Sequence, residues 1–173
     1  MDYEVYVPGK NMCVPSCLQS VLDRRNLDVP CQKDIARELG MASNEPLFFR
    51  EDLEPLRGFL QARDLGLKFF NPFFDMFIDS YDFLKEHFSE RVSKEVDMMV
   101  GFDPVALYRS DNLILNHFAL VSYFEREFDR VVLHDNQEGI SKVSLFELNR
   151  SIAPNSSSDN PFAKDGKGFY VIS

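Results

Sequence analysis

The hydrophobic pattern of this chain changes its period about midway along the sequence, and this change limits the folds open to it. In the first half, apolar residues recur at intervals of three and four, which predicts helices at residues 13–25, 32–39, 50–63 and 77–88. In the second half, short runs rich in β-branched and aromatic residues predict strands at residues 105–108, 117–124, 128–134 and 168–172. Helices followed by antiparallel strands indicate an α+β fold rather than a doubly wound sheet.

The size and charge of the chain narrow its possible partners. With 173 residues, 45% of them hydrophobic, and no repeat or long linker, we expect a single domain over residues 1–173. The net charge of −9 argues against a nucleic-acid partner and against binding to an anionic membrane surface. No apolar run reaches the ~20 residues of a membrane-spanning helix, and the N-terminus lacks the pattern of a signal peptide. Nothing in the sequence indicates an oligomeric state.

The three cysteines do not form a disulfide framework, because their number is odd, so we expect a reducing, cytoplasmic location. Cys13 stands at the start of the first predicted helix, where free backbone N–H groups and the helix dipole favour a thiolate. The same N–H groups could stabilise the oxyanion that forms when the sulfur attacks a carbonyl. Cys17 lies one turn further in and is expected to be a small buried hydrophobe. A purely structural role for Cys13 is the alternative.

A cysteine nucleophile needs a base, and the sequence contains three histidines. His117 begins one predicted strand, and Asp135 ends the VVLHD run that follows a turn at residues 125–129. In an antiparallel hairpin these two residues lie at the same end of the sheet, where the carboxylate could orient the imidazole. His134 alternates onto the other face, and His87 is expected on a solvated helix face. The alternative is that His117 and Asp135 are ordinary polar residues at strand ends.

Other chemistries have little support in the sequence. Cys13 and Cys17 have a C-x-x-x-C spacing, but they share one helix and no second ligand pair follows, so we expect no metal site. There is no phosphate-binding loop, no dinucleotide fingerprint and no G-x-S-x-G elbow. We therefore expect no cofactor.

Two parts of the sequence resemble one family. The run NMCVPSCLQSVLDRRNLDVPCQKDIAREL, residues 11–39, resembles the opening of papain-like cysteine peptidases of the double-glycine, bacteriocin-processing type. The runs HFALVSYF and VVLHDN resemble the two strands that carry the family's base and carboxylate. The resemblance implies a papain-like fold, in which an N-terminal helical half with the catalytic helix packs on a C-terminal antiparallel sheet. It also implies that Cys13 is the nucleophile, His117 the base and Asp135 the orienting carboxylate.

The chain departs from the family pattern at three positions. Val14 replaces the glycine after the nucleophile, and Asn136 replaces the proline after the aspartate. The family's oxyanion glutamine lies six residues before the cysteine, where this chain has Val7. Asn11 or Lys10 could supply the missing donor, or the backbone N–H of Cys13 could act with another group. Asn136 is also an alternative to Asp135, since some papain-like enzymes use asparagine as the orienting residue.

These observations predict a cysteine-dependent hydrolase that cleaves a peptide, isopeptide or amide bond through a thioester acyl-enzyme. The expected partner is a peptide or another acyl or amide substrate. The first alternative is an acyltransferase of the same fold, in which an amine rather than water resolves the thioester. The second is a catalytically inactive peptide-binding module, which the missing glutamine favours.

Overall fold

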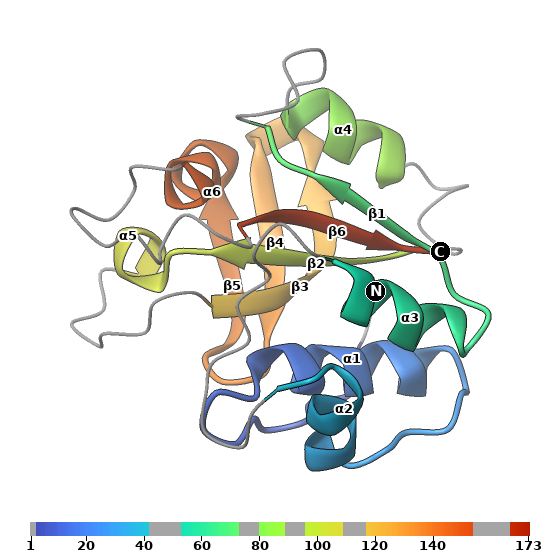
Figure 1. Ribbon diagram of the computed structural model, residues 1–173. Coiled ribbons are helices and arrows are strands. Elements are labelled where there is room, and N and C mark those ends of the chain that lie inside the picture. The colour runs from blue at the N-terminus through green and yellow to red at the C-terminus, as the bar shows by residue number, and fades with distance from the viewer. Residues whose placement is uncertain (1–2, 42–52, 73–79, 89–95, 109–116, 154–166) are drawn as a thin grey trace.

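The computed structural model describes residues 3–41, 53–72, 80–88, 96–108, 117–153 and 167–173 (Figure 1). Within these residues, one antiparallel sheet has the strand order β1-β6-β2-β3-β4-β5. Its strands are β1 Leu67–Phe70, β2 Asp97–Phe102, β3 His117–Glu125, β4 Arg130–Asp135, β5 Gly139–Ser144 and β6 Gly168–Ile172. The fold is therefore α+β, as the sequence predicts.

Helices lie against both faces of the sheet. They are α1 Cys13–Arg24, α2 Gln32–Glu38, α3 Glu54–Gln61, α4 Ser80–His87, α5 Pro104–Tyr108 and α6 Leu145–Ile152, and a 3-10 turn, η1 Arg126–Phe128, joins β3 to β4. In Figure 1, α1 and α2 lie on one side of the sheet, and α4 and α6 lie on the other. The buried side chains of α3 join the cluster formed by α1 and α2.

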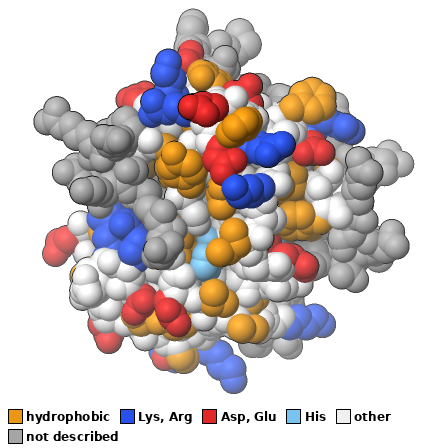
Figure 2. Space-filling model, turned by 180° about the vertical axis from the view of Figure 1, so that it is seen from behind, with side chains coloured by type: hydrophobic (Ala, Val, Ile, Leu, Met, Phe, Trp, Pro, Cys, Tyr) orange, Lys and Arg blue, Asp and Glu red, His pale blue; other side chains and the backbone are white. Residues whose placement is uncertain are grey.

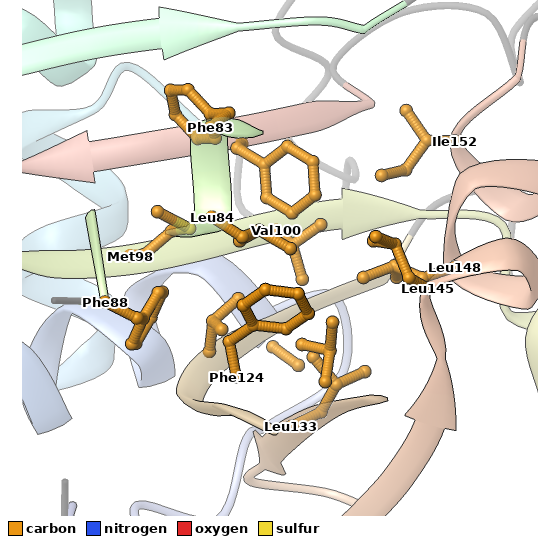
Figure 3. Close-up of a cluster of buried hydrophobic side chains, with 14 of the residues drawn as sticks. Phe83, Leu84, Phe88, Met98, Val100, Phe124, Leu133, Leu145, Leu148 and Ile152 are labelled. Atoms are coloured by element: carbon orange, nitrogen blue, oxygen red, sulfur yellow. The ribbon is translucent and has the colours of Figure 1, made fainter. Parts of the chain in front are cut away.

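Each face of the sheet has its own hydrophobic cluster. On β3, Phe118 and Leu120 pack toward α1, whereas Ala119 and Val121 pack toward α4 and α6. Figure 3 shows the cluster on the face covered by α4 and α6, where the labelled side chains from these helices and from the central strands meet. By the same alternation, His117 lies on the face of the sheet opposite α1, at the very end of its strand.

Several predicted elements are confirmed within the described residues. The first helix begins at Cys13, and the turn between β3 and β4 lies at residues 126–129. The predicted helices at 50–63 and 77–88 appear as α3 and α4, while residues 50–52 and 77–79 lie outside the described part. A capping box opens α6, since Ser144 Oγ accepts from Glu147 N at 3.1 Å and the Glu147 carboxylate accepts from Ser144 N.

The predicted strand at residues 105–108 is wrong, because these residues form α5. Val105 and Tyr108 have high β propensity, but the residues before them specify a helix start. Asp103 Oδ1 accepts hydrogen bonds from Val105 N at 2.9 Å and Ala106 N at 3.2 Å, and Pro104 occupies the first helical position. The cap therefore outweighs the strand propensity of a very short segment.

On the face of the molecule in Figure 2, acidic, basic and hydrophobic side chains are mixed, and the basic side chains do not form one continuous patch among the coloured residues. Across the described part of the chain, no helix is long and apolar enough to cross a membrane.

Candidate active site

Cys13 is the first residue of α1 and is partly exposed. The preceding turn is closed by a hydrogen bond from Met12 N to Gly9 O at 3.1 Å, and Met12 O accepts the first helical bond from Ser16 N. The backbone N–H groups of Cys13 and Val14 have no partner within the helix, because no helical carbonyl lies four residues before them. The thiol thus lies beside free N–H donors at the positive end of the helix dipole.

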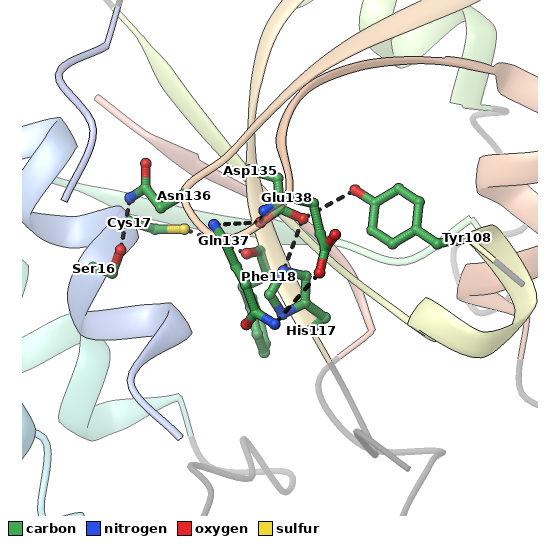
Figure 4. A network of polar contacts seen from close by, with 9 residues as sticks. All are labelled: Ser16, Cys17, Tyr108, His117, Phe118, Asp135, Asn136, Gln137 and Glu138. Carbon is green, nitrogen blue, oxygen red and sulfur yellow. Dashed lines mark hydrogen bonds and ion pairs between the residues drawn. The ribbon is translucent and has the colours of Figure 1, made fainter. Parts of the chain in front are cut away.

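The structure brings His117 and Asp135 into direct contact at one end of the sheet. His117 Nε2 lies 2.8 Å from Asp135 Oδ2, and both side chains are almost completely buried (Figure 4). Phe102 of β2 lies opposite His117 of β3 in the sheet, and their rings pack edge to face with the ring centroids 5.6 Å apart. With Nε2 on the carboxylate, Nδ1 is the ring nitrogen left for Cys13.

Asp135 is held by donors on both of its carboxylate oxygens. Oδ1 accepts from the backbone N–H groups of Gln137 at 2.9 Å and Glu138 at 3.1 Å, which form the turn between β4 and β5. Oδ2 accepts from Tyr108 Oη at 3.0 Å in addition to His117. Figure 4 shows these groups converging on Asp135 from β3, α5 and the turn. These four contacts therefore fix the orientation of the carboxylate.

The contacts of His117 favour its protonated form. Burial alone lowers the pKa of His117, but hydrogen bonding to Asp135 and to Cys13, together with the negative charge of Asp135, outweighs burial and raises the pKa to about 10. Burial also raises the pKa of Asp135, but the bonds from His117 and from the turn N–H groups outweigh it and lower the pKa. A protonated His117 therefore lies between the carboxylate of Asp135 and the thiol of Cys13.

Cys17 has a different environment from Cys13. It is fully buried, and its thiol lies 3.6 Å from the carbonyl oxygen of Phe118, the residue after His117. Burial, and then the nearby Cys13 and Asp135, raise the pKa of the Cys17 thiol well above its usual value. Cys17 therefore packs α1 against β3 as a neutral thiol.

The two other histidines do not belong to this group. His134 is buried on the α1 face of the sheet, where its ring meets Tyr3 edge to face at 5.7 Å. His87 was expected on a solvated face, and this is wrong: it is buried, its Nδ1 lies 2.8 Å from Phe83 O, and its ring packs on Phe83. The large aromatic content of the α4 region buries a residue whose neighbours in sequence are charged.

Asn136 points toward α1 rather than toward His117 (Figure 4). Its Nδ2 donates to Ser16 Oγ at 2.7 Å and to Ser20 Oγ at 3.1 Å. The side chain in contact with His117 is therefore that of Asp135, and Asn136 connects the same turn to the helix that carries Cys13.

The segment before Cys13 contains the candidate oxyanion donors. Asn11 is partly buried and has a left-handed backbone with φ 59°, two residues before Cys13. Lys10 is exposed, and Val7 is 75% exposed, so the side chain at the family's glutamine position extends into solvent. Gln32 of α2 holds this segment by accepting from Gly9 N at 3.0 Å and donating to Val7 O at 2.9 Å. Sequence reasoning missed both Gln32 and Tyr108, which no local motif marks.

Among the described residues, no three His, Cys, Asp or Glu side chains are arranged to hold a metal ion.

The fold, in which an N-terminal helical half packs on a C-terminal antiparallel sheet, is similar to that of two solved cysteine peptidase domains of the double-glycine type. Among solved structures, a double glycine motif protease from an AMS/PCAT transporter, in complex with its leader peptide, has a TM-score of 0.56 and 14% identity, covering 98% of this chain and 89% of that chain. The peptidase domain of Streptococcus ComA, a bifunctional ABC transporter of a quorum-sensing pathway, has a TM-score of 0.58 and 11% identity, with coverages of 98% and 96%. The predicted resemblance to double-glycine peptidases is thus confirmed for the fold. No protein-family model matches the chain, and no curated protein sequence matches it significantly.

Proposed function

We propose that this protein is a cysteine-dependent hydrolase that cleaves a peptide or related amide bond, with Cys13, His117 and Asp135 as its reacting group. The observation that carries the proposal is the 2.8 Å contact between His117 and Asp135 at the sheet end that Cys13 reaches from the start of α1. Even a paired charge is costly to bury, and buried groups with a strongly shifted pKa gather at functional sites, which supports a reactive role for His117 beside the Cys13 thiol.

The geometry supports a two-step reaction. The Cys13 thiolate attacks the carbonyl carbon, and the oxyanion accepts hydrogen bonds at the start of α1. The His117 imidazolium gives its proton to the leaving amine, so that a thioester remains on Cys13. His117, now neutral, takes a proton from water, and the resulting hydroxide releases the acyl group as a carboxylic acid and restores the thiolate. Asp135 keeps the ring oriented and stabilises the imidazolium in both steps.

The proposed substrate is a peptide, because a protein of similar fold has been solved with a leader peptide bound. The three cysteines are free thiols, and a reducing compartment such as the cytoplasm would keep Cys13 in its reactive form.

The direct test is the reactivity of Cys13 toward iodoacetamide at pH 7, followed residue by residue by mass spectrometry. Cys13 should react at least tenfold faster than the exposed Cys31, and His117→Ala should remove this advantage. Equal rates for Cys13 and Cys31 would instead favour a peptide-binding module. Product analysis of an acylated enzyme, with and without added amines, then separates a hydrolase from an acyltransferase.

A further inference from the structure

Tyr108 is a fourth residue of this group, and the sequence gives no motif for it. Its phenol oxygen donates to Asp135 Oδ2 at 3.0 Å, the same oxygen that lies 2.8 Å from His117 Nε2. Two donors, one from α5 and one from β3, therefore share one oxygen of the carboxylate. The hydrogen bond to one donor weakens the charge available to the other.

The position of Tyr108 is fixed by packing. The ring of Tyr108 packs edge to face on the ring of Phe102, with the ring centroids 5.5 Å apart. The ring of Phe102 also packs edge to face on the ring of His117, with the centroids 5.6 Å apart. Helix α5, which carries Tyr108, is held at its start by the Asp103 cap and by a hydrogen bond from Asp103 N to Ser151 O of α6 at 3.0 Å. The phenol therefore approaches Asp135 from a rigid support.

We propose that Tyr108 is a positioning residue of the proposed hydrolase, whose hydrogen bond limits how strongly Asp135 holds a proton on His117. This inference rests on the proposed function. A base that stays protonated cannot take a proton from water in the second step, so an unmoderated His–Asp pair would slow release of the acyl group. With the oxygen shared, the imidazolium is stable enough to act as the acid of the first step, and it still loses its proton readily enough for neutral His117 to act as the base of the second.

The charged and titratable groups around the pair are consistent with this role. Cys13 of α1 and Asp135 of β4 act on His117, and Cys17 of α1 also lies near Asp135. Burial and the charge of Asp135 raise the pKa of Tyr108, so it remains a donor over the whole working range. Glu138, in the turn after β4, acts on Tyr108 in the same direction.

The test measures the pKa of the His117 ring directly. In a Cys13→Ala background, which removes the coupled thiol, the ring resonances of the three histidines are followed by NMR from pH 5 to 11 with and without Tyr108→Phe. Loss of the phenol should raise the pKa of His117 by about 0.5 unit. In a chain that keeps Cys13, Tyr108→Phe should slow the release of acetate after acylation by p-nitrophenyl acetate. The expected slowing at neutral pH is about threefold, the factor that half a pKa unit produces. An unchanged or lowered His117 pKa overturns the proposal.

Tyr3→Phe is a matched control, because Tyr3 Oη also donates to a buried carboxylate, Asp97 Oδ1, at 2.9 Å. Asp97 lies at the opposite end of β2 from Phe102. The control should lower thermal stability and leave the His117 titration unchanged; an equal shift in both variants overturns a specific role for Tyr108. Since the titration needs no turnover, its result is independent of the Cys13 reactivity that tests the proposed function.

Discussion

Asn136 Nδ2 donates a hydrogen bond to Ser16 Oγ at 2.7 Å, joining residues 120 positions apart. Asn136 directly follows Asp135, and Ser16 lies one helical turn after Cys13. The bond therefore links the helix that carries Cys13 to the turn that follows Asp135. The same amide also donates to Ser20 Oγ at 3.1 Å, one turn further along α1, so two successive turns of the helix contact Asn136.

The two serines extend this link to the N-terminal segment. Ser16 Oγ donates to the carbonyl of Tyr6, and Ser20 Oγ donates to the carbonyl of Glu4 at 2.7 Å. The side chain of Asn136 thus connects the turn after β4 to α1 and, through the two serines, to the N-terminal segment. The proline that double-glycine peptidases have at this position has no side-chain amide and could not make these bonds.

Asn136→Ala is expected to lower the free energy of unfolding by about 1–3 kcal/mol, because it leaves buried serine hydroxyls without their donor. It should also slow alkylation of Cys13, since α1 loses its connection to the turn beside Asp135. Chemical denaturation and the iodoacetamide rate measure the two effects.

Asn71→Ala provides the control for Asn136→Ala. Asn71 is also buried, donates from Nδ2 to Lys167 O at 2.9 Å, and follows β1, which β6 and β2 separate from β3. It should lower stability without changing the alkylation rate of Cys13. If Asn136→Ala behaves in the same way, the link does not position the nucleophile.

The candidate site could be predicted because its residues stand at element ends with clear local signals. Cys13 precedes an amphipathic run with Pro15 in its first turn, and the hairpin between the two β-rich runs fixes the relation of His117 to Asp135. The contacts of Tyr108 and Asn136 could not be predicted in this way, since they depend on how α5 and α1 pack against the sheet.

Three strands were not predicted from the residue pattern, each for its own reason. Strand β2 is buried on both faces, so its sequence DMMVGF shows no alternation. Strand β5, GISKVS, lies at the sheet edge and is mostly polar and exposed. Strand β1 has only four residues, too few for a period to appear. Their positions come from pairing with strands distant in sequence.

Cys17→Ala is expected to destabilise the protein by about 1–2 kcal/mol and to retain the reactivity of Cys13, because Cys17 is a fully buried side chain in the α1–β3 contact. Cys13→Ala should do the opposite, leaving stability nearly unchanged and abolishing any turnover. Thermal denaturation and peptide cleavage by both variants measure this. The reverse pattern would show that Cys17 is the nucleophile.

The raised pKa of His117 makes stability depend on pH in a defined window. The folded pKa is about 10 and the ordinary value is 6.5, so the stabilisation from protonated His117 is complete below about pH 6.5 and is lost as the pH rises toward 10. The pKa of Asp135 is lowered from 3.8, so its contribution is present above that value and is lost as the pH falls below it.

Asp135→Asn tests this window, since it removes the carboxylate that holds the proton. The difference in unfolding free energy between the native chain and this variant should be greatest between pH 4 and 6.5 and should shrink toward pH 10. Urea denaturation at pH 5.5, 7.5 and 9.5 measures it. A difference that stays constant with pH would show that the pair contributes no proton-linked stability.

Asn11→Gly examines the oxyanion donor, the part of the site where this chain differs most from the family. Glycine adopts the left-handed backbone of Asn11 without strain, so the substitution removes the side-chain amide and keeps the turn before Cys13. If the amide stabilises the oxyanion, acylation by p-nitrophenyl acetate should slow by about 10²-fold or more. Alkylation by iodoacetamide forms no oxyanion, so its rate should remain unchanged.

The control is Asn26→Gly, which makes the same change at a left-handed residue, φ 55°, at the other end of α1. It should alter neither rate, since Asn26 follows the far end of α1, a helix of 12 residues and therefore about 18 Å long. Acylation by p-nitrophenyl acetate and alkylation by iodoacetamide both require the thiolate, but only acylation requires an oxyanion donor. Comparing their rates therefore separates oxyanion binding from thiolate formation. If Asn11→Gly slows neither reaction, the oxyanion must be bound by backbone N–H groups of α1 or by Lys10, and Lys10→Ala then distinguishes these two donors.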